Sequence, residues 1–595
     1  MTSIDELFKG VGSKRKLEPL RDPNQIYKSA RLNGHSSSSS SRHAQVEDEP
    51  PTEDDDTEAG PALPPDDEDE EGDYGPSLPP DDNGDDDEGR FFGGGVSAAQ
   101  NEILDYVDGQ DGALPQDKID VHWLRKTALN FEKRISKNAE LRAKYEADPS
   151  KFIQSEAELD ADVKALSILS EHPDLYSEFA KLGCVASLVG LLAHENSDIA
   201  IDALEILNEL TDDEVAAEEA DWGALVDAAL EADLLGLVVS NLERLDEKEE
   251  VDRNGVYHAL NVVENLCSRI ATAEVVGKQD MLLKWLLGRI QTKENPVGQN
   301  KQYAAEILAI LVQSSKKNRR KLAQIDAVDM MLQLVAAYRK RNPEKGGEEE
   351  EYMENLFEAL TCIVDEEDGK TKFIEAEGVE LCLIMLKEGK MSKVASLRLL
   401  DHAVGGPTGA HVCAKLVEAG GLKNIFTLFM KKSDDSETAE HLVGIFASLL
   451  RLLPAGSGER IRTLAKFVEK DYEKTVKLVK LRREYAARLD KENEAIQAQQ
   501  ALLSVDKREQ MADEWFSRKL DAGLFSLQTI DVVLAWLVAE DAGAQTKIMA
   551  LLAERDETLR VIKQTIQEQL EGMDADDDEG KDTRDMLATL VKFLQ

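Results

Sequence analysis

The chain has 595 residues, of which 42% are hydrophobic and 32% charged, and its formal net charge at pH 7 is −47. Residues 1–100 contribute nine basic and 25 acidic side chains, and the remaining 495 residues contribute 62 basic and 93 acidic ones, so both parts are acidic. Affinity for nucleic acids depends mainly on Lys and Arg displacing counterions. The composition therefore argues against general nucleic-acid binding, predicts little or no direct RNA contact, and favours basic peptides or proteins as partners.

The cysteines are few and far apart, and none forms a CxxC pair: Cys184, Cys267, Cys362, Cys382 and Cys413. We interpret them as buried free thiols in a reducing compartment. No apolar run reaches the ~20 residues that a membrane span requires. We therefore expect a soluble intracellular protein without a membrane contact.

Residues 1–95 are predicted to be a disordered acidic tail. Between Glu47 and Glu88 there are 21 acidic residues and no Lys or Arg, so charge repulsion opposes a packed core. GPALPPDD from Gly60 and GPSLPPDD from Gly75 are near-copies that fit either a linear motif or a stiff acidic spacer. At the beginning of the tail, Lys14-Arg15-Lys16 is a candidate nuclear-import signal.

Residues 96–178 are predicted to form an N-terminal helical cap. The segment Ile119–Tyr145 has the apolar spacing of an amphipathic helix, with a largely basic outer face. A stack of repeats needs such a cap to cover its first apolar face.

Residues 179–453 repeat one pattern about six times: a short leading segment, an apolar helix, a polar turn and a second amphipathic helix. The apolar helices begin near Gly183, Asp233, Asp280, Ala327, Gly378 and Gly421. The intervals of 43 to 51 residues are typical of armadillo or HEAT arrays, in which each unit buries its apolar face against its neighbours. We therefore predict an all-α, right-handed armadillo/HEAT-like solenoid.

Residues 454–595 are predicted to form a C-terminal helical bundle that covers the other end of the solenoid. Pro454 interrupts the array, and Arg460–Ser504 has the pattern of one or two long charged helices. Leu520–Ala539, which contains Trp536, is apolar enough to need burial. No segment alternates apolar and polar residues as a strand does.

Several segments resemble the beta-catenin-like protein 1 family, a nuclear armadillo-type family associated with pre-mRNA splicing. They cover nearly all of residues 90–595 and read GRFFGGG (Gly89–Gly95), FEKRISKN (Phe131–Asn138), DPSKFIQSE (Asp148–Glu156), PDLY (Pro173–Tyr176), NLERLDE (Asn241–Glu247), MENLFEAL (Met353–Leu360), LLDHAVGGPTG (Leu399–Gly409), FASLLR (Phe446–Arg451) and RKLDAGLFSLQ (Arg518–Gln528). The resemblance implies a scaffold that joins the spliceosome through the Prp19 and CDC5-like assembly. It also implies binding of basic nuclear-localisation-type segments.

The candidate partner-binding residues come from the second amphipathic helices, which line the concave face of armadillo arrays. A carboxylate there can pair with Lys or Arg of a bound peptide, and an Asn amide can bond the peptide backbone. The alternative is that they are ordinary solvated helix positions. The candidates are Asp202, Glu205, Asn208, Glu209, Asn261, Glu264, Asn265, Glu306, Glu354, Asn355 and Glu358.

A local reversal of charge occurs where five cations fall within six residues: Lys316, Lys317, Arg319, Arg320 and Lys321. This cluster could contact RNA phosphate or an acidic partner, or it could be a solvated turn between two repeats.

Enzymatic motifs such as GxxxxGK[ST], HExxH and GxSxG are absent from the sequence. Asp401, His402, His411 and Cys413 could form a metal or catalytic cluster, but the intervening Gly405-Gly406-Pro407 favours a simple junction between helices. We expect no enzyme activity, cofactor or metal.

The sequence therefore predicts a non-enzymatic nuclear scaffold of the splicing machinery that holds a basic, extended partner segment on an acidic concave face. Formation of a homodimer is left open. The alternative is a nuclear-import adaptor of the importin-alpha kind, which has a similar groove. Such adaptors carry a basic N-terminal arm and WxxxN pairs, which this chain lacks.

Overall fold

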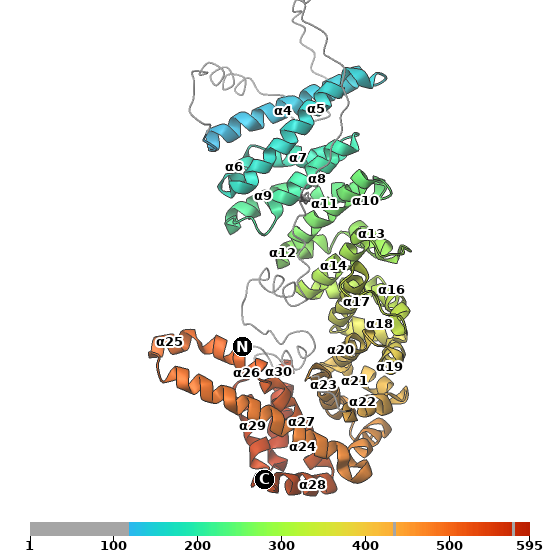
Figure 1. Ribbon diagram of the computed structural model, residues 1–595, viewed down its shortest axis with the longest axis vertical. Helices are drawn as coiled ribbons and strands as arrows, with labels where there is room; N and C mark the ends of the chain where they lie inside the picture. The colour runs from blue at the N-terminus through green and yellow to red at the C-terminus, as the bar shows by residue number, and fades with distance from the viewer. Residues whose placement is uncertain (1–117, 432–435, 574–577, 595) are drawn as a thin grey trace, which may run out of the picture. The chain divides into compact units, whose positions relative to one another are not determined.

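The computed structural model describes residues 118–431, 436–573 and 578–594. Every regular element in these ranges is a helix, as Figure 1 shows, and no strand occurs in them. The predicted all-α solenoid is confirmed. Within the same ranges, no single helix has both the length and the hydropathy needed to cross a membrane.

Two long helices, α4 (Val121–Lys144) and α5 (Ile153–Ala165), precede the repeats. The carboxylate of Asp120 caps α4 by accepting hydrogen bonds from the backbone N–H groups of His122 and Trp123. The two helices pack against each other through Leu124, Phe131 and Leu159, all of which are buried. Short 3₁₀ turns flank α5: η1 (Pro149–Lys151), η2 (Leu166–Glu171) and η3 (Pro173–Leu175).

The helices from Tyr176 to Leu452 form units of three rather than two, because the leading segment of each repeat is itself helical. This is the armadillo arrangement. The first helices of the units are α6 (Tyr176–Lys181), α9 (Glu219–Glu231), α12 (Ile270–Val276), α15 (Lys316–Gln324), α18 (Glu367–Glu375) and α21 (Ala410–Glu418). The second helices are α7 (Cys184–Gly190, extended by η4, Leu191–Ala193), α10 (Leu234–Arg244), α13 (Asp280–Gln291), α16 (Ala327–Val335, extended by η5, Ala336–Arg339), α19 (Gly378–Glu388) and α22 (Gly421–Met430). The third helices are α8 (Ser197–Thr211), α11 (Glu250–Cys267), α14 (Gln299–Ser314), α17 (Glu348–Ile363), α20 (Ser392–Val404) and α23 (Ser436–Leu452); η6 (Pro407–Gly409) precedes α21.

A left-handed residue joins the first helix of a unit to the second in five of the described units. It immediately precedes α7, α10, α16, α19 and α22, with φ between 57° and 79°, at Gly183, Asp233, Asp326, Glu377 and Gly420. A single residue in this conformation reverses the chain within one step and lets the next helix start at once. These positions coincide with, or lie one residue before, the repeat starts predicted from the sequence.

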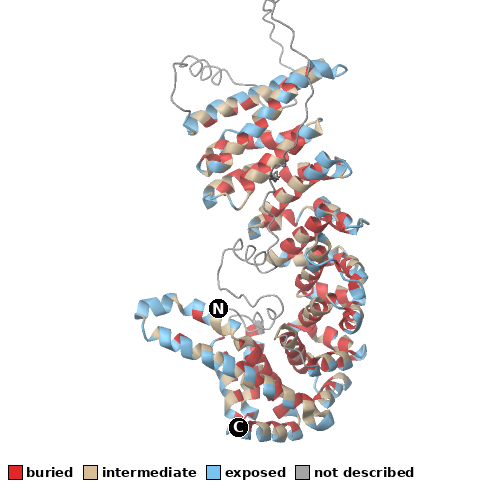
Figure 2. Cartoon of the chain, viewed as in Figure 1, coloured by how far each residue is buried: buried red, intermediate tan, exposed pale blue. Residues whose placement is uncertain are grey.

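The third helices form one continuous inner row, in which each contacts the next: α8, α11, α14, α17, α20 and α23. Helix α5 extends the row at its N-terminal end and α27 (Leu524–Glu540) at its C-terminal end. Apolar residues on both sides of these helices are buried, which produces the red band along the stack in Figure 2. Each unit therefore depends on its neighbours for burial.

The C-terminal region continues this row, and its helix α27 packs against α23 of the last unit. Helix α24 (Gly458–Gln500) bends at Glu469–Tyr472 and packs along α27. Helix α27 is buried on most sides and lies against α23. Trp536 is only partly buried, with the guanidinium of Arg460 4.9 Å from the ring centroid. The remaining helices are α25 (Val505–Gln510), α26 (Ala512–Asp521), α28 (Ala542–Ala553), α29 (Arg560–Glu571) and α30 (Asp578–Phe593).

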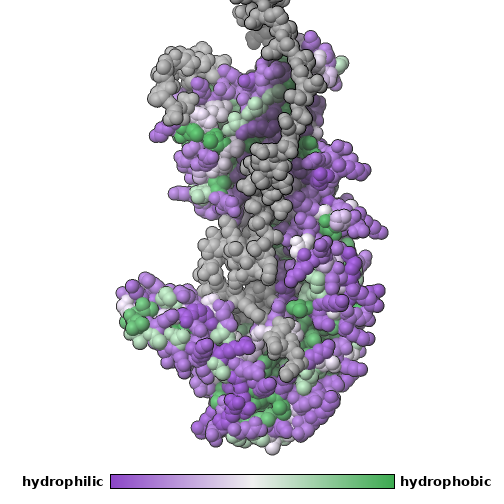
Figure 3. Space-filling model, in the orientation of Figure 1, coloured by the Kyte–Doolittle hydropathy of each residue, from purple (hydrophilic) through white to green (hydrophobic). Residues whose placement is uncertain are grey.

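The end of α24 and helices α25 and α26 form a hairpin with an apolar tip, visible as a green patch in Figure 3. Leu502 is 86% exposed and Val505 is 66% exposed there. Trp515 of α26 is buried and donates a hydrogen bond of 3.2 Å to Gln499 of α24. The hairpin is therefore anchored by its inner face and leaves a small apolar surface uncovered.

Candidate functional site on the inner helices

All eleven candidate partner-binding residues lie on four successive inner helices, α8, α11, α14 and α17. Glu354 is exposed, Glu264 is buried, and the other nine are partly buried. The structure therefore brings the candidates into one row, but their environments differ.

Glu264 corrects the sequence-based expectation of a solvated carboxylate, because its side chain is only 6% exposed. Burial, with a further contribution from Glu306, raises the pKa of Glu264 to about 8. The hydroxyl of Tyr303 contacts both Oε2 of Glu264 and Oδ1 of Asn261. The hydroxyl of Tyr303 donates to Glu264, and this hydrogen bond opposes the rise in pKa that burial causes. Glu264 is thus a buried acid that joins α11 to α14.

Asn208 and Asn265 also differ from the expectation, because they bond to each other across α8 and α11. Nδ2 of Asn265 lies 3.1 Å from the backbone oxygen of Asn208, from its Oδ1 and from Oγ1 of Thr211. The amide that was expected to donate to a peptide backbone is therefore directed into the contact between two units.

Asp202 lies at the N-terminal end of the row, where α8 meets α5. Its carboxyl group faces Asp160, and Nζ of Lys164 is 2.7 Å from Asp160 and 3.4 Å from Asp202. Burial raises the pKa of Asp202 to about 7, and the hydrogen bond with Asp160 adds to that rise. Near neutral pH this pair can therefore hold a proton.

Glu205 and Glu209 lie on the same side of α8, opposite His258 of α11. Oε2 of Glu209 accepts a hydrogen bond of 2.5 Å from the hydroxyl of Ser167. Burial lowers the pKa of His258, and the two carboxylates oppose that change. Both carboxylates therefore have fewer internal partners than Asp202 of the same helix.

The row ends at Arg398 of α20, a residue that sequence reasoning missed. Its guanidinium lies 3.1 Å from Oε2 of Glu358. The other carboxylate oxygen of Glu358, Oε1, accepts a hydrogen bond from Gln313. Glu306 accepts a hydrogen bond of 3.1 Å from Gln302. The row of carboxylates is therefore closed by a cation in the fifth unit.

The sequence suggested a solvated turn for the basic cluster. In the structure the cluster instead forms the first turns of helix α15. Most of its charges pair with acids of neighbouring units: Lys317 with Glu274 at 2.7 Å, Lys321 with Asp280 at 2.6 Å, and Arg320 with Glu366 at 3.0 Å. Ion pairs between successive units account for these cations, which leaves little of the cluster for RNA or an acidic partner. Lys316 is exposed.

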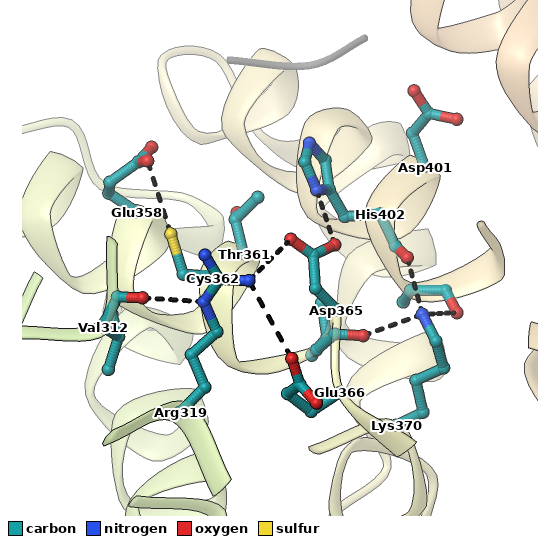
Figure 4. Close-up of polar contacts among 12 residues, drawn as sticks. Val312, Arg319, Glu358, Thr361, Cys362, Asp365, Glu366, Lys370, Asp401 and His402 are labelled. Atoms are coloured by element: carbon teal, nitrogen blue, oxygen red, sulfur yellow. Dashed lines mark hydrogen bonds and ion pairs between the residues drawn. The ribbon is translucent and has the colours of Figure 1, made fainter. Parts of the chain in front are cut away.

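Arg319 and Lys370 close the carbonyl ends of the inner helices, as Figure 4 shows. Nε of Arg319 donates to the backbone oxygen of Val312 at 2.7 Å. The buried ammonium of Lys370 donates to the backbone oxygens of Val364 and of His402, at 2.8 and 2.9 Å. Both side chains satisfy carbonyls that a helix leaves unpaired at its C-terminus.

The polar residues around Gly405-Gly406-Pro407 are distributed over separate contacts. His402 pairs with Asp365 and His441 with Asp401, each at 3.0 Å. Within the described ranges, no group of three or more His, Cys, Asp or Glu side chains is arranged to hold a metal ion. The five cysteines are free and buried, and burial raises the pKa of Cys184 to about 12.

The candidate import signal Lys14-Arg15-Lys16 and the acidic tail lie outside the described residues, so they stay predictions.

Comparison with known proteins agrees with this architecture. A sequence model of the family described as "Catenin-beta-like, Arm-motif containing nuclear" matches residues 101–567. The chain belongs to this family. The beta-catenin-like protein 1 homolog of Schizosaccharomyces pombe is 38% identical over 471 residues, which cover 79% of this chain and 82% of that relative. Human beta-catenin-like protein 1 is 36% identical over 470 residues, which cover 76% of this chain and 82% of the human protein.

Among solved structures, a designed armadillo repeat protein is similar to 44% of this catenin-beta-like chain and 99% of its own length. Its TM-score is 0.34 and its identity 17%.

Proposed function

We propose that this catenin-beta-like protein is a non-enzymatic nuclear scaffold of the pre-mRNA splicing machinery. It holds an extended basic segment of a partner protein along its inner helices. The partners implied by the family resemblance are proteins of the Prp19 and CDC5-like assembly and nuclear-localisation-type segments. Armadillo motifs, which the family description includes, support a role in protein interaction.

The observation that carries the proposal is the row of accessible carboxylates on the inner helices α8, α14 and α17. The row consists of Glu205 and Glu209 on α8, Glu306 on α14 and Glu354 on α17. Glu358 is left out because Arg398 and Gln313 already engage it. Neighbouring helices pack about 8–10 Å apart, and an extended peptide advances about 3.3 Å per residue. One helix therefore corresponds to about three peptide residues, and we expect the ligand to carry Lys or Arg at intervals of about three.

A labelled Lys/Arg-rich peptide of twelve residues tests the proposal by fluorescence anisotropy. Combined Glu205→Lys, Glu209→Lys and Glu354→Lys should weaken binding at least about tenfold and flatten its salt dependence. Glu264 is omitted from this set because reversing a buried group would damage the fold. The matched control is Glu231→Lys, Glu243→Lys and Glu418→Lys, three exposed positions on the first and second helices.

Equal loss of affinity in both triple variants would show that overall charge, and not the inner row, attracts the peptide. Capture of partners from nuclear extract with the wild-type chain and the inner-row variant then tests the splicing assignment. Selective loss of splicing proteins supports it, whereas capture of import receptors and diverse cargo would favour the import-adaptor alternative.

A further inference from the structure

Helix α4 bears a stripe of lysines on the side opposite its buried face. Lys126, Lys133, Lys137 and Lys144 follow one another at steps of seven, four and seven residues. At 3.6 residues per turn these side chains fall within a sector of about 40°, over a length of about 27 Å. All four are exposed, whereas Leu124 and Phe131 on the opposite side are buried.

The arginines of the same helix are used differently. Arg125 pairs with Glu178, Arg134 with Glu158 and Asp162, and Arg142 with Glu156 and Glu195. The arginines therefore tie α4 to the helices beneath it, through contacts that suit their forked geometry.

Among the described residues, most of the lysines on α4 do not form ion pairs with neighbouring helices. Lys137 reaches Glu158 at 3.2 Å, but within the described part of the chain no acidic side chain pairs with Lys126, Lys133 or Lys144. Lys144 lies near the C-terminus of the helix, where the helix dipole already favours a cation, and its Nζ is 5.4 Å from the ring centroid of Tyr145. Neither the dipole nor an ion pair accounts for Lys126 and Lys133.

We propose that this lysine stripe is a second interaction surface, separate from the inner helices, and that it binds an extended acidic polypeptide segment. A stripe of about 27 Å matches roughly eight residues of extended chain. Lysines act as mobile point charges and do not require the planar, bidentate partners that arginines select. They can therefore follow carboxylates along a chain without a fixed register.

A polypeptide fits this surface better than a nucleic acid. No aromatic side chain lies within the lysine sector to stack with bases, which is how single-stranded nucleic acids are usually held. Residues 101–595 carry 62 basic and 93 acidic side chains, so a long polyanion that extended past the stripe would meet a repulsive surface. A short acidic segment can match the stripe without extending beyond it.

The test uses the full chain and three fluorescein-labelled probes at low salt: a dodecapeptide of alternating Asp and Glu, its Asn/Gln counterpart, and a twelve-nucleotide oligouridylate. Combined Lys126→Glu, Lys133→Glu and Lys144→Glu should weaken binding of the acidic peptide about tenfold, because three exposed charge pairs become repulsive. The control triple, Lys284→Glu, Lys387→Glu and Lys423→Glu, makes the same charge change at exposed positions on second helices and should alter affinity less than about twofold.

Each result decides the proposal. Selective loss of the acidic peptide in the α4 variant, with an unchanged thermal midpoint and no binding of the neutral peptide, supports it. Equal loss in the two triple variants would overturn it, as would failure of the wild type to bind the acidic peptide. Tighter binding of the oligouridylate, lost in the same α4 variant, would assign the stripe to nucleic acid and also overturn it.

Discussion

Nε of Arg482 lies 2.7 Å from Oδ1 of Asp531, and both side chains are buried. This ion pair joins α24 to α27, the helix that covers the last armadillo unit. Removing one partner of a buried pair leaves an uncompensated charge, which commonly destabilises a protein by about 3–5 kcal/mol.

Asp531→Ala should therefore strongly lower the free energy of unfolding, by about 3–5 kcal/mol. The denaturant midpoint measured by circular dichroism checks this expectation. Asp513→Ala is the control, since Asp513 is exposed on α26. Similar midpoints for the two variants would mean that the pair does not hold α24 against α27.

Glu264→Gln should change how stability depends on pH. The folded-state pKa of about 8 exceeds the ordinary value of 4.5, so between these values the folded state binds one more proton than the unfolded state. The contribution of Glu264 is fully present below about pH 4.5 and decreases by about 1.4 kcal/mol per pH unit as the pH rises towards 8. The Gln variant should lack this decrease.

Denaturation of both proteins at pH 5.5, 6.5 and 7.5 measures the difference. We expect the stability of Glu264→Gln relative to the wild type to increase at each step. Parallel curves for the two proteins would show that Glu264 is ionised in the folded state and that burial does not raise its pKa.

Glu377→Gly should stabilise the protein. Glu377 has φ of 57°, a left-handed conformation that disfavours side chains with a Cβ by about 1 kcal/mol and that glycine adopts freely. A rise in the thermal midpoint is expected. Glu375→Gly is the control, because Glu375 is the last residue of α18 and is not among the residues with positive φ, so glycine relieves no strain there and should not stabilise the protein. A lower midpoint for Glu377→Gly would indicate that the side chain itself is needed at the turn.

Truncation after Leu453 should produce an aggregating protein. It removes α27, and the buried apolar face of α23 would then be exposed to water. Light scattering and the soluble fraction measure this outcome. Deletion of residues 1–95 is the comparison and should leave the thermal midpoint nearly unchanged, since that segment lacks the apolar content for a core. A soluble, monomeric truncated protein would contradict a covering role for α27.

The period of the repeats, the helical class and the positions of the turns could be predicted from the sequence, because they depend on local patterns. Apolar spacing identified α27 as a helix that needs burial, and the repeat starts lie within one residue of the left-handed turns at Gly183, Asp326 and Glu377. The first helix of each unit was missed because segments such as α12 and α15 are short, and their amphipathic pattern spans only about two turns.

The chemical state of the candidate site depended on contacts between units, which sequence spacing does not contain. Glu205 and Glu264 both occupy polar positions of amphipathic helices, yet Glu205 stays partly exposed while Glu264 is buried beneath Tyr303. The cations of α15 look like a free patch in the sequence, but they pair with acids from 41 to 46 residues away, such as Glu274 and Glu366. The sequence by itself determined the fold, since burial of one helix face follows from local periodicity. Only the tertiary structure decided which charges stay available to a partner, because that depends on which side chains neighbouring units place opposite them.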